Sequence, residues 1–179
     1  QEVQTLMTQA VEQAERLNEK VYIAVVDREA NILGVFNMNG APSIGLPTDP
    51  FLGTIARART AAYISSNQNA FTTLTGCFTT RTHFPPTTNN TPAGPLFGVP
   101  FSNRGGSDIQ PNNGAVAGQA VNGQPGLTAF PGGVPIYKNG LLAGGIGVSG
   151  CSNTLSQING ILDFCAGYFQ DETIALGAV

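Results

Sequence analysis

The chain has 179 residues, of which only 11% are charged, and its formal net charge is −3; this length is typical of a single domain with a substantial core. Eight basic against eleven acidic residues leave no basic field that would attract phosphates, so nucleic acid and anionic membranes are disfavoured as partners, and no apolar run approaches the roughly 18–20 residues that span a bilayer. Because sparse charge is commoner outside the cell and weakens repulsion between copies, we expect a secreted protein, extracellular or periplasmic, that self-associates.

The first third of the chain has the patterns of a helix, a hairpin and a second helix. Apolar residues recur at helical spacing over residues 2–19, with Glu and Gln between them, which predicts an amphipathic helix. Two β-rich apolar runs follow at residues 21–26 and 32–38, joined by a polar turn, and they predict an antiparallel hairpin. The second helix has Pro50 in its first turn, a favourable place for proline, and is expected to run to about Ser65.

A long segment with weak periodicity comes next. A short helix is expected over residues 70–75, and residues 85–133 contain eight of the twelve prolines. We therefore expect an irregular arm over about residues 79–131, inserted into a single domain that covers residues 1–179. Loops longer than about 15 residues without structure of their own tend to be functional or to pack on a partner, so the arm is expected to mediate the contact between copies.

The strongest local pattern is a hairpin centred on Asn139 and Gly140. Asn-Gly favours a type I′ turn, in which both central residues have positive φ. The following run over residues 141–148 places three glycines among apolar residues, which indicates an interior strand against which another element packs closely. Helical spacing then returns over residues 155–169, and a short helical turn is expected after Asp171 and Glu172. This order of elements predicts the α+β class, with helices flanking an antiparallel sheet.

The three cysteines, Cys77, Cys151 and Cys165, lack the spacing of a metal site. One disulfide with one free thiol is typical of a secreted protein, and three buried thiols are the alternative. We expect the bridge to join Cys151 and Cys165, because the residues between them can fold back as a short helical excursion.

No catalytic constellation stands out, and a non-catalytic protein is favoured. His83 is the only imidazole and has no adjacent nucleophile, and one histidine cannot anchor a zinc site. Flanked by Phe84 and Pro85, it could be an axial ligand of haem iron; alternatively it is a loop histidine bonded to the backbone. Arg59 has a planar fork suited to a ligand carboxylate, and its alternative role is that of a solvated or ion-paired side chain.

Several motifs, taken in order along the chain, carry a family resemblance. They are Ala58-Arg59-Thr60-Ala61-Ala62-Tyr63, His83-Phe84-Pro85-Pro86, Gly132-Gly133-Val134-Pro135-Ile136-Tyr137, Gly144-Gly145-Ile146-Gly147-Val148-Ser149-Gly150 and Asp171-Glu172-Thr173-Ile174-Ala175. Together they resemble the GlcG/haem-binding-protein-S family, which also contains the C-terminal domain of PduO-type corrinoid adenosyltransferases. The resemblance implies a profilin-like antiparallel sheet of about five strands, assembly into dimers or octamers and, in some members, haem binding.

The sequence departs from the family pattern in the long arm and in the residues between Gly150 and Gln170. Haem-binding members use a histidine from the N-terminal part, and no histidine precedes His83 here. We therefore expect a secreted, non-catalytic haem- or small-ligand-binding domain that self-associates, with the ligand between the second helix, the glycine-rich strand and the arm. The residues assigned to that site are His83, Arg59, Tyr137, Gly132 and Gly133. The alternative is a structural subunit of an extracellular homo-oligomer or filament.

Overall fold

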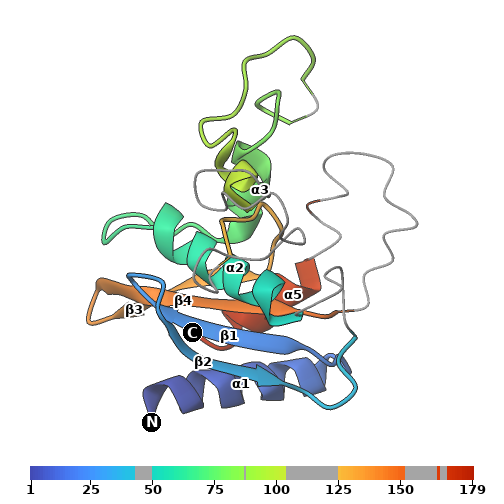
Figure 1. The fold of residues 1–179 in the computed structure, drawn as a ribbon, viewed down its shortest axis with the longest axis vertical. Helices are drawn as coiled ribbons and strands as arrows, with labels where there is room; N and C mark the ends of the chain where they lie inside the picture. Colours follow the sequence, from blue (N-terminus) through green and yellow to red (C-terminus); the bar gives the residue numbers. More distant parts are fainter. Residues whose placement is uncertain (43–49, 87, 104–124, 152–164, 166–168) are drawn as a thin grey trace, which may run out of the picture.

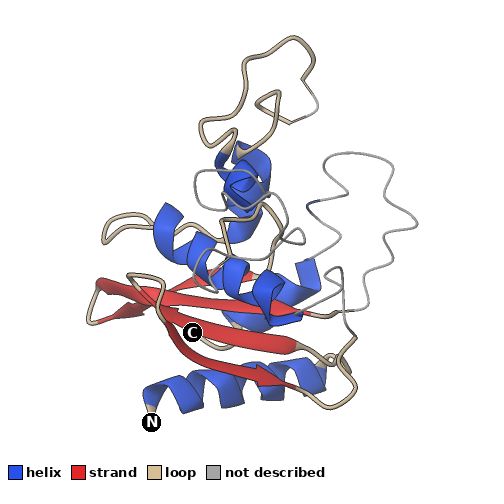
Figure 2. Cartoon of the chain, in the orientation of Figure 1, coloured by secondary structure: helices blue, strands red, loops and turns tan. Residues whose placement is uncertain are grey.

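The computed structural model describes residues 1–42, 50–86, 88–103, 125–151, 165 and 169–179, which fold as an antiparallel sheet with helices on both faces (Figures 1 and 2). The α+β class is therefore confirmed, and the described residues contain four strands where about five were expected. None of the helices in this part of the chain is long and apolar enough to cross a membrane. In chain order the elements are α1 (Glu2–Arg16), β1 (Tyr22–Asp27), β2 (Ile32–Asn37), α2 (Pro50–Ile64), α3 (Thr73–Thr79), a short 3-10 helix η1 (Val99–Asn103), β3 (Gly133–Lys138), β4 (Leu141–Ser149) and α5 (Phe169–Leu176).

The sheet has the strand order β2-β1-β4-β3, so β1 and β4 are interior and β2 and β3 are the edges. One face packs on α1 and α5, and its core contains Ile23 and Val25 of β1 with Ile146 of β4. The other face packs on α2, and the smaller side chains Ala24 and Val26 point to it. The alternation along β1 follows from the two-residue period of a strand, which sends successive side chains to opposite faces.

The hairpin centred on Asn139 and Gly140 is confirmed. Both residues have positive φ, 53° and 77°, as a type I′ turn requires. A Cβ added at Gly147 would lie 2.2 Å from the carbonyl oxygen of Thr54, and one added at Gly145 would lie 2.2 Å from that of Ala58. These two glycines of β4 therefore allow the backbone of α2 to lie directly on the sheet.

The predicted disulfide is wrong in one of its two partners. The bridge joins Cys77 of α3 to Cys165, 88 residues later, and Cys151 is a buried free thiol. Cys151 comes immediately after β4, where its amide donates a hydrogen bond to Asp171 and its side chain belongs to the core on the α1 face. It is thus fixed in the core, whereas α3 brings Cys77 to Cys165. The helix expected over residues 155–169 lies largely outside the described residues.

The described part of the arm begins as two antiparallel segments that leave the end of α3. Backbone hydrogen bonds run from Leu96 N to Thr79 O at 3.1 Å, from Gly94 N to Arg81 O at 2.8 Å and from Phe84 N to Pro92 O at 2.9 Å. In Figure 1 this segment extends away from the sheet, above α3. Apart from η1, the arm's described residues form neither helix nor strand.

Candidate functional site

The acidic pair at the start of α5 is buried and bound by protein groups. Arg57 of α2 reaches Asp171, with 3.3 Å between Nη1 and Oδ2, and both side chains are almost completely buried, at 7% and 1% exposure. The same nitrogen donates to the carbonyl oxygen of Val148 at 2.7 Å, and the amide of Cys151 donates to Asp171 Oδ1 at 3.0 Å. Burial raises the pKa of Asp171, an effect that Arg57 opposes.

Glu172 joins three elements through its carboxylate. It accepts hydrogen bonds from the hydroxyl of Thr72, from the amide of Leu74 at 2.9 Å and from the amide of Gly132 at 3.3 Å. Burial raises the pKa of Glu172, and these donors oppose the rise. The beginning of α3, the segment before β3 and the first turn of α5 are therefore held together at one carboxylate.

Gly132 and Gly133, which the sequence analysis assigned to a ligand site, lie in this cluster. Both are buried, and the amide of Gly133 donates to the hydroxyl of Thr73 at 2.7 Å. Their amides are thus bonded to protein acceptors. The sequence analysis did not identify Arg57 as a partner of Asp171, although a buried acidic side chain requires a nearby cation, and that requirement was the signal for it.

Burial also acts on the thiol beside the pair. The pKa of Cys151 is raised by desolvation and by the neighbouring Asp171. Since the thiolate is the reactive form of cysteine, Cys151 is an inert part of the core. The buried cluster of Arg57, Cys151, Asp171 and Glu172 therefore serves the fold.

Tyr137 and Arg59 lie in separate places. The hydroxyl of Tyr137 donates to the carbonyl oxygens of Ser66 and Asn69, at 2.7 and 3.1 Å, which attaches β3 to the loop after α2. Arg59 donates from Nη1 to the carbonyl oxygen of Pro125, and its guanidinium lies 5.9 Å from the ring centroid of Tyr63. Its Nε is buried and has no hydrogen-bond partner among the described residues.

A pocket of about 460 Å³ lies between α2, α3 and the arm. A ligand was expected between the second helix, the glycine-rich strand and the arm. This pocket lies beside the helix and the arm, but no residue of the glycine-rich strand β4 lines it. It is lined by Tyr63, Ile64, Phe71, Thr75, Thr79, Pro95, Leu96, Val99 and Leu127.

His83 is exposed on the arm and is bonded to the backbone. Its Nδ1 lies 2.8 Å from the carbonyl oxygen of Thr91. A carbonyl can only accept, so Nδ1 carries the proton and Nε2 of the neutral ring has a free lone pair. The backbone hydrogen bond expected of a loop histidine is therefore present, and it does not involve Nε2, the ring nitrogen that could bind a metal. His83 does not line the pocket between α2, α3 and the arm.

The arm also exposes aromatic side chains. The rings of Phe97 and Phe101 meet edge to face, with 5.6 Å between centroids, yet both are exposed. Phe84, next to His83, and Phe130 are exposed as well. Within the described residues, no group of three or more His, Cys, Asp or Glu side chains could hold a metal ion.

Comparisons with known proteins give a consistent result. The profile of a family described as "Haem degrading protein HbpS-like" matches residues 1–157. No curated protein matches the sequence. Among solved structures, a complex of PduOC with haem is 20% identical and superposes with a TM-score of 0.56, covering 99% of this chain and 88% of that one.

Two further structures are similar over the same extent. Protein ORFY of Klebsiella pneumoniae is 18% identical, with a TM-score of 0.57 and coverage of 99% of this chain and 84% of that one. A double mutant of HbpS from Streptomyces reticuli is 20% identical, with a TM-score of 0.55 and coverage of 99% and 81%. At these identities the likeness is one of fold.

Proposed function

The chain belongs to the HbpS-like family, and from that premise we propose that it is a secreted, non-catalytic haem-binding domain that self-associates through its arm. The family match confirms the resemblance inferred from the motifs. The disulfide between Cys77 and Cys165 supports secretion, because such bonds persist mainly in oxidising compartments. When bound, haem would supply an iron centre to which a protein imidazole such as that of His83 could be a ligand.

The observation that carries the proposal is the hydrogen bond between His83 Nδ1 and the carbonyl oxygen of Thr91. Metal-binding histidines almost always donate their other ring N–H to a carbonyl, a carboxylate or water, which fixes the tautomer and the orientation of the ring. His83 has this arrangement at Nδ1. Its Nε2 is therefore the group that would bind haem iron.

The surroundings of His83 fit one side of a macrocycle. Phe84 is exposed beside it and offers an apolar surface to a porphyrin, but an exposed loop cannot cover both faces of haem. A second copy of the chain would supply the other cover. The arm favours that association, because burying exposed side chains such as Phe97 and Phe101 would contribute roughly 1.5–3 kcal/mol each if they were fully desolvated.

The experiment is a haem titration followed by absorbance in the Soret region. We expect the wild-type protein to give a saturable, shifted Soret band and His83→Ala to lose it. Asn89→Ala, which changes another exposed residue of the arm, is the matched control and should behave as the wild type. An unchanged band in His83→Ala would refute His83 as the iron ligand, and the absence of any band in the wild type would refute haem binding.

A second candidate is a structural subunit without ligand chemistry, and the edge strand β2 favours it. Ile32, Leu33, Val35 and Phe36 are all exposed there, and exposed apolar edge strands promote pairing with other chains. Light scattering at micromolar concentration tests association, with residues 86–131 replaced by a short Gly/Ser linker as the comparison. An oligomer that takes up no haem favours this candidate, and a monomer both before and after the replacement refutes self-association through the arm.

A further inference from the structure

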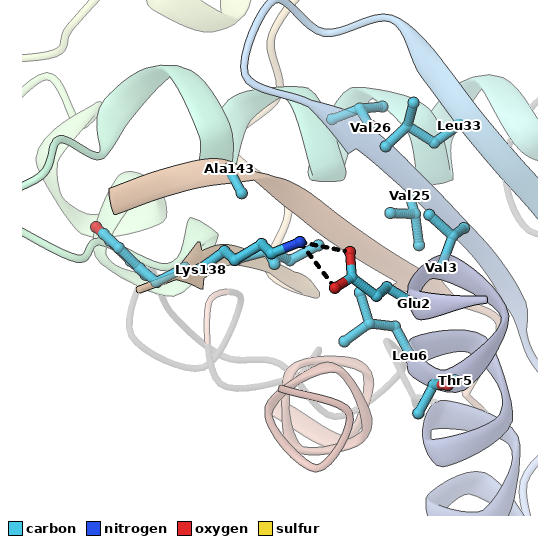
Figure 3. Close-up of a pocket in the computed structure, with 11 residues that line it drawn as sticks. Glu2, Val3, Thr5, Leu6, Val25, Val26, Leu33, Lys138 and Ala143 are labelled. Carbon is cyan, nitrogen blue, oxygen red and sulfur yellow. Dashed lines mark hydrogen bonds and ion pairs between the residues drawn. The ribbon is translucent and has the colours of Figure 1, made fainter. Parts of the chain in front are cut away.

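A second pocket lies on the opposite face of the sheet from the one beside α2. Its volume is about 340 Å³, which is within the range of small-molecule sites. It opens between the first turns of α1 and the end of the sheet near the β3–β4 turn (Figure 3). The lining residues are Glu2, Val3, Thr5 and Leu6 of α1, Val25 and Val26 of β1, Leu33 of β2, Ile136, Tyr137 and Lys138 of β3, and Ala143 of β4.

Two β-bulges flank this pocket. Between β1 and β2, Val25 pairs with Gly34 and Val26 pairs with Ile32, so Leu33 is the extra residue. Between β3 and β4, Ile136 pairs with Gly144 and Tyr137 with Leu142, so Ala143 is the extra residue. Bulges re-aim a side chain and are over-represented next to functional sites. Here both extra residues line the same pocket, on either side of β1.

The walls that result are apolar and partly open to water. Leu33 remains 51% exposed, although it lines the same pocket as Val3 and Val25. Ala143 is also exposed, and its small side chain fills little of the pocket. An apolar body placed against Leu33 and Leu6 would remove this surface from water, which is the main source of affinity in such sites.

The mouth of the pocket carries a single ion pair. Lys138 reaches across from β3, and its Nζ lies 2.8 and 3.0 Å from the two carboxylate oxygens of Glu2 (Figure 3). The side chains are 60% and 75% exposed, and ion pairs at such exposure contribute little to stability. The pair can therefore open at little cost.

The two partners differ in what they lose when the pair opens. Glu2 lies in the first turn of α1, where the helix dipole continues to stabilise a negative charge. Lys138 has no other ion-pair or hydrogen-bond partner for Nζ among the described residues. A ligand anion would thus pair with Lys138 and would also meet the positive end of the helix, whereas a ligand cation could pair only with Glu2 and would face both of these positive groups.

We propose that this pocket binds an amphipathic monocarboxylate, with its apolar chain against Leu33, Leu6 and Ala143 and its carboxylate on Lys138 in place of Glu2. The site is separate from His83 and does not depend on haem. A medium-chain fatty acid such as decanoate has this chemistry and is the probe that we use below.

Isothermal titration calorimetry of the full chain with decanoate tests the proposal. Lys138→Gln should weaken binding by about tenfold, as the loss of one charge-assisted hydrogen bond implies. Glu2→Gln should strengthen it, because the competing carboxylate is removed. Decanol, which has the same chain without the charge, should bind more weakly than decanoate, and Ala143→Phe should block the apolar wall.

Matched controls separate the site from general charge effects. Lys20→Gln and Glu12→Gln each remove one exposed charge elsewhere and should leave the affinity unchanged, as should His83→Ala. The proposal is overturned if the wild type does not bind decanoate, if Lys138→Gln binds as tightly as the wild type, or if Lys20→Gln weakens binding as much. Equal affinity for decanol would also overturn it. Retained binding in His83→Ala keeps this test independent of the haem proposal.

Discussion

The cluster around Asp171 and the arm around His83 both come from motifs that carry the family resemblance, but they differ in whether their polar atoms are bound. Asp171 is buried against Arg57 and the amide of Cys151. His83 is exposed, and its one hydrogen bond, to Thr91, leaves Nε2 open. A buried charge that is paired inside the protein is part of the fold, because removing its partner would leave an uncompensated charge in the core. An exposed, pre-oriented imidazole has coordination capacity left for a ligand.

A motif of this family can therefore have a structural role or a ligand-binding role. The Asp-Glu pair attaches α5 to α2, α3 and the segment before β3, so it has a structural role in this chain. Residues 80–86 and 88–98 of the arm contribute no strand to the sheet. We therefore propose that ligands bind at the arm and at the pocket beside α1, while the buried cluster serves the fold.

The largest effect is expected at the buried ion pair. Arg57→Leu leaves Asp171 buried without its cation, and breaking such a pair typically costs about 3–5 kcal/mol of the free energy of unfolding. Urea denaturation followed by circular dichroism measures it. Arg28→Leu, at an exposed arginine, is the control and should change stability by less than about 0.5 kcal/mol. Equal stability of Arg57→Leu and the wild type would contradict a structural role for the pair.

The contact of α2 with β4 should give the next largest effect. Gly147→Ala places a Cβ 2.2 Å from the carbonyl oxygen of Thr54, and overpacking of this kind costs about 1–3 kcal/mol. Gly76→Ala in α3 is the matched control, because the added Cβ would meet only the side chain of Ile64, at an ordinary contact distance of 3.5 Å. Alanine is also a better helix former than glycine at this helical position. A loss of stability in Gly76→Ala as large as that in Gly147→Ala would contradict the account of close packing at β4.

Local chemistry made some of these features predictable. The turn at Asn139 and Gly140 was predicted because a type I′ turn needs positive φ at two successive residues, and Asn-Gly is a residue pair that favours this conformation. The interior position of β4 followed from its glycines. The bridge to Cys165 was assigned to the wrong partner because pairing depends on where α3 lies in space, which the spacing of the cysteines does not encode.

The sites depend still more on tertiary structure. Leu33 and Ala143 are ordinary apolar residues of strand patterns, and only the register of the paired strands reveals them as bulge residues on one pocket. Lys138 and Glu2 are 136 residues apart, and no local pattern links them. His83 was predicted as a candidate by elimination, whereas its bond to Thr91 depends on the pairing of the two arm segments.

The pH dependence of stability should reveal the buried carboxyl of Glu172. Its pKa in the folded state is raised by burial above the ordinary value of 4.5. The folded state therefore holds the proton more tightly than the unfolded chain, and this contribution to stability is full below the unfolded pKa and is lost as pH rises through the folded pKa. Glu172→Gln, which cannot ionise, should gain stability relative to the wild type as pH rises from about 4.5.

Denaturation of both proteins in a pH series measures the difference. Glu12→Gln, at an exposed position of α1, corrects for the general loss of a carboxylate and should track the wild type. If Glu172→Gln loses stability relative to the wild type as pH rises, measured as the free energy of unfolding, the raised pKa of Glu172 is contradicted.

The smallest effect on stability is expected at His83. His83→Ala removes one exposed hydrogen bond and should change the free energy of unfolding by no more than about 0.5 kcal/mol, while haem binding is lost. This is the reverse of Arg57→Leu, which should lower stability and leave the iron ligand in place. A His83→Ala protein that unfolds in mild denaturant would make the imidazole a structural group and remove the contrast between the two regions.

The most direct test of His83 as the haem ligand uses the fact that the chain contains one histidine. Selective ¹⁵N labelling of histidine therefore gives ring signals from His83 alone in a nuclear magnetic resonance spectrum. Without haem, and at a pH where the ring is neutral, the shifts should place its proton on Nδ1 and leave Nε2 unprotonated. Addition of ferric haem should remove the Nε2 signal from its free position in proportion to the haem bound. If haem is taken up while the His83 signals stay unchanged, the iron is bound elsewhere and the central claim fails.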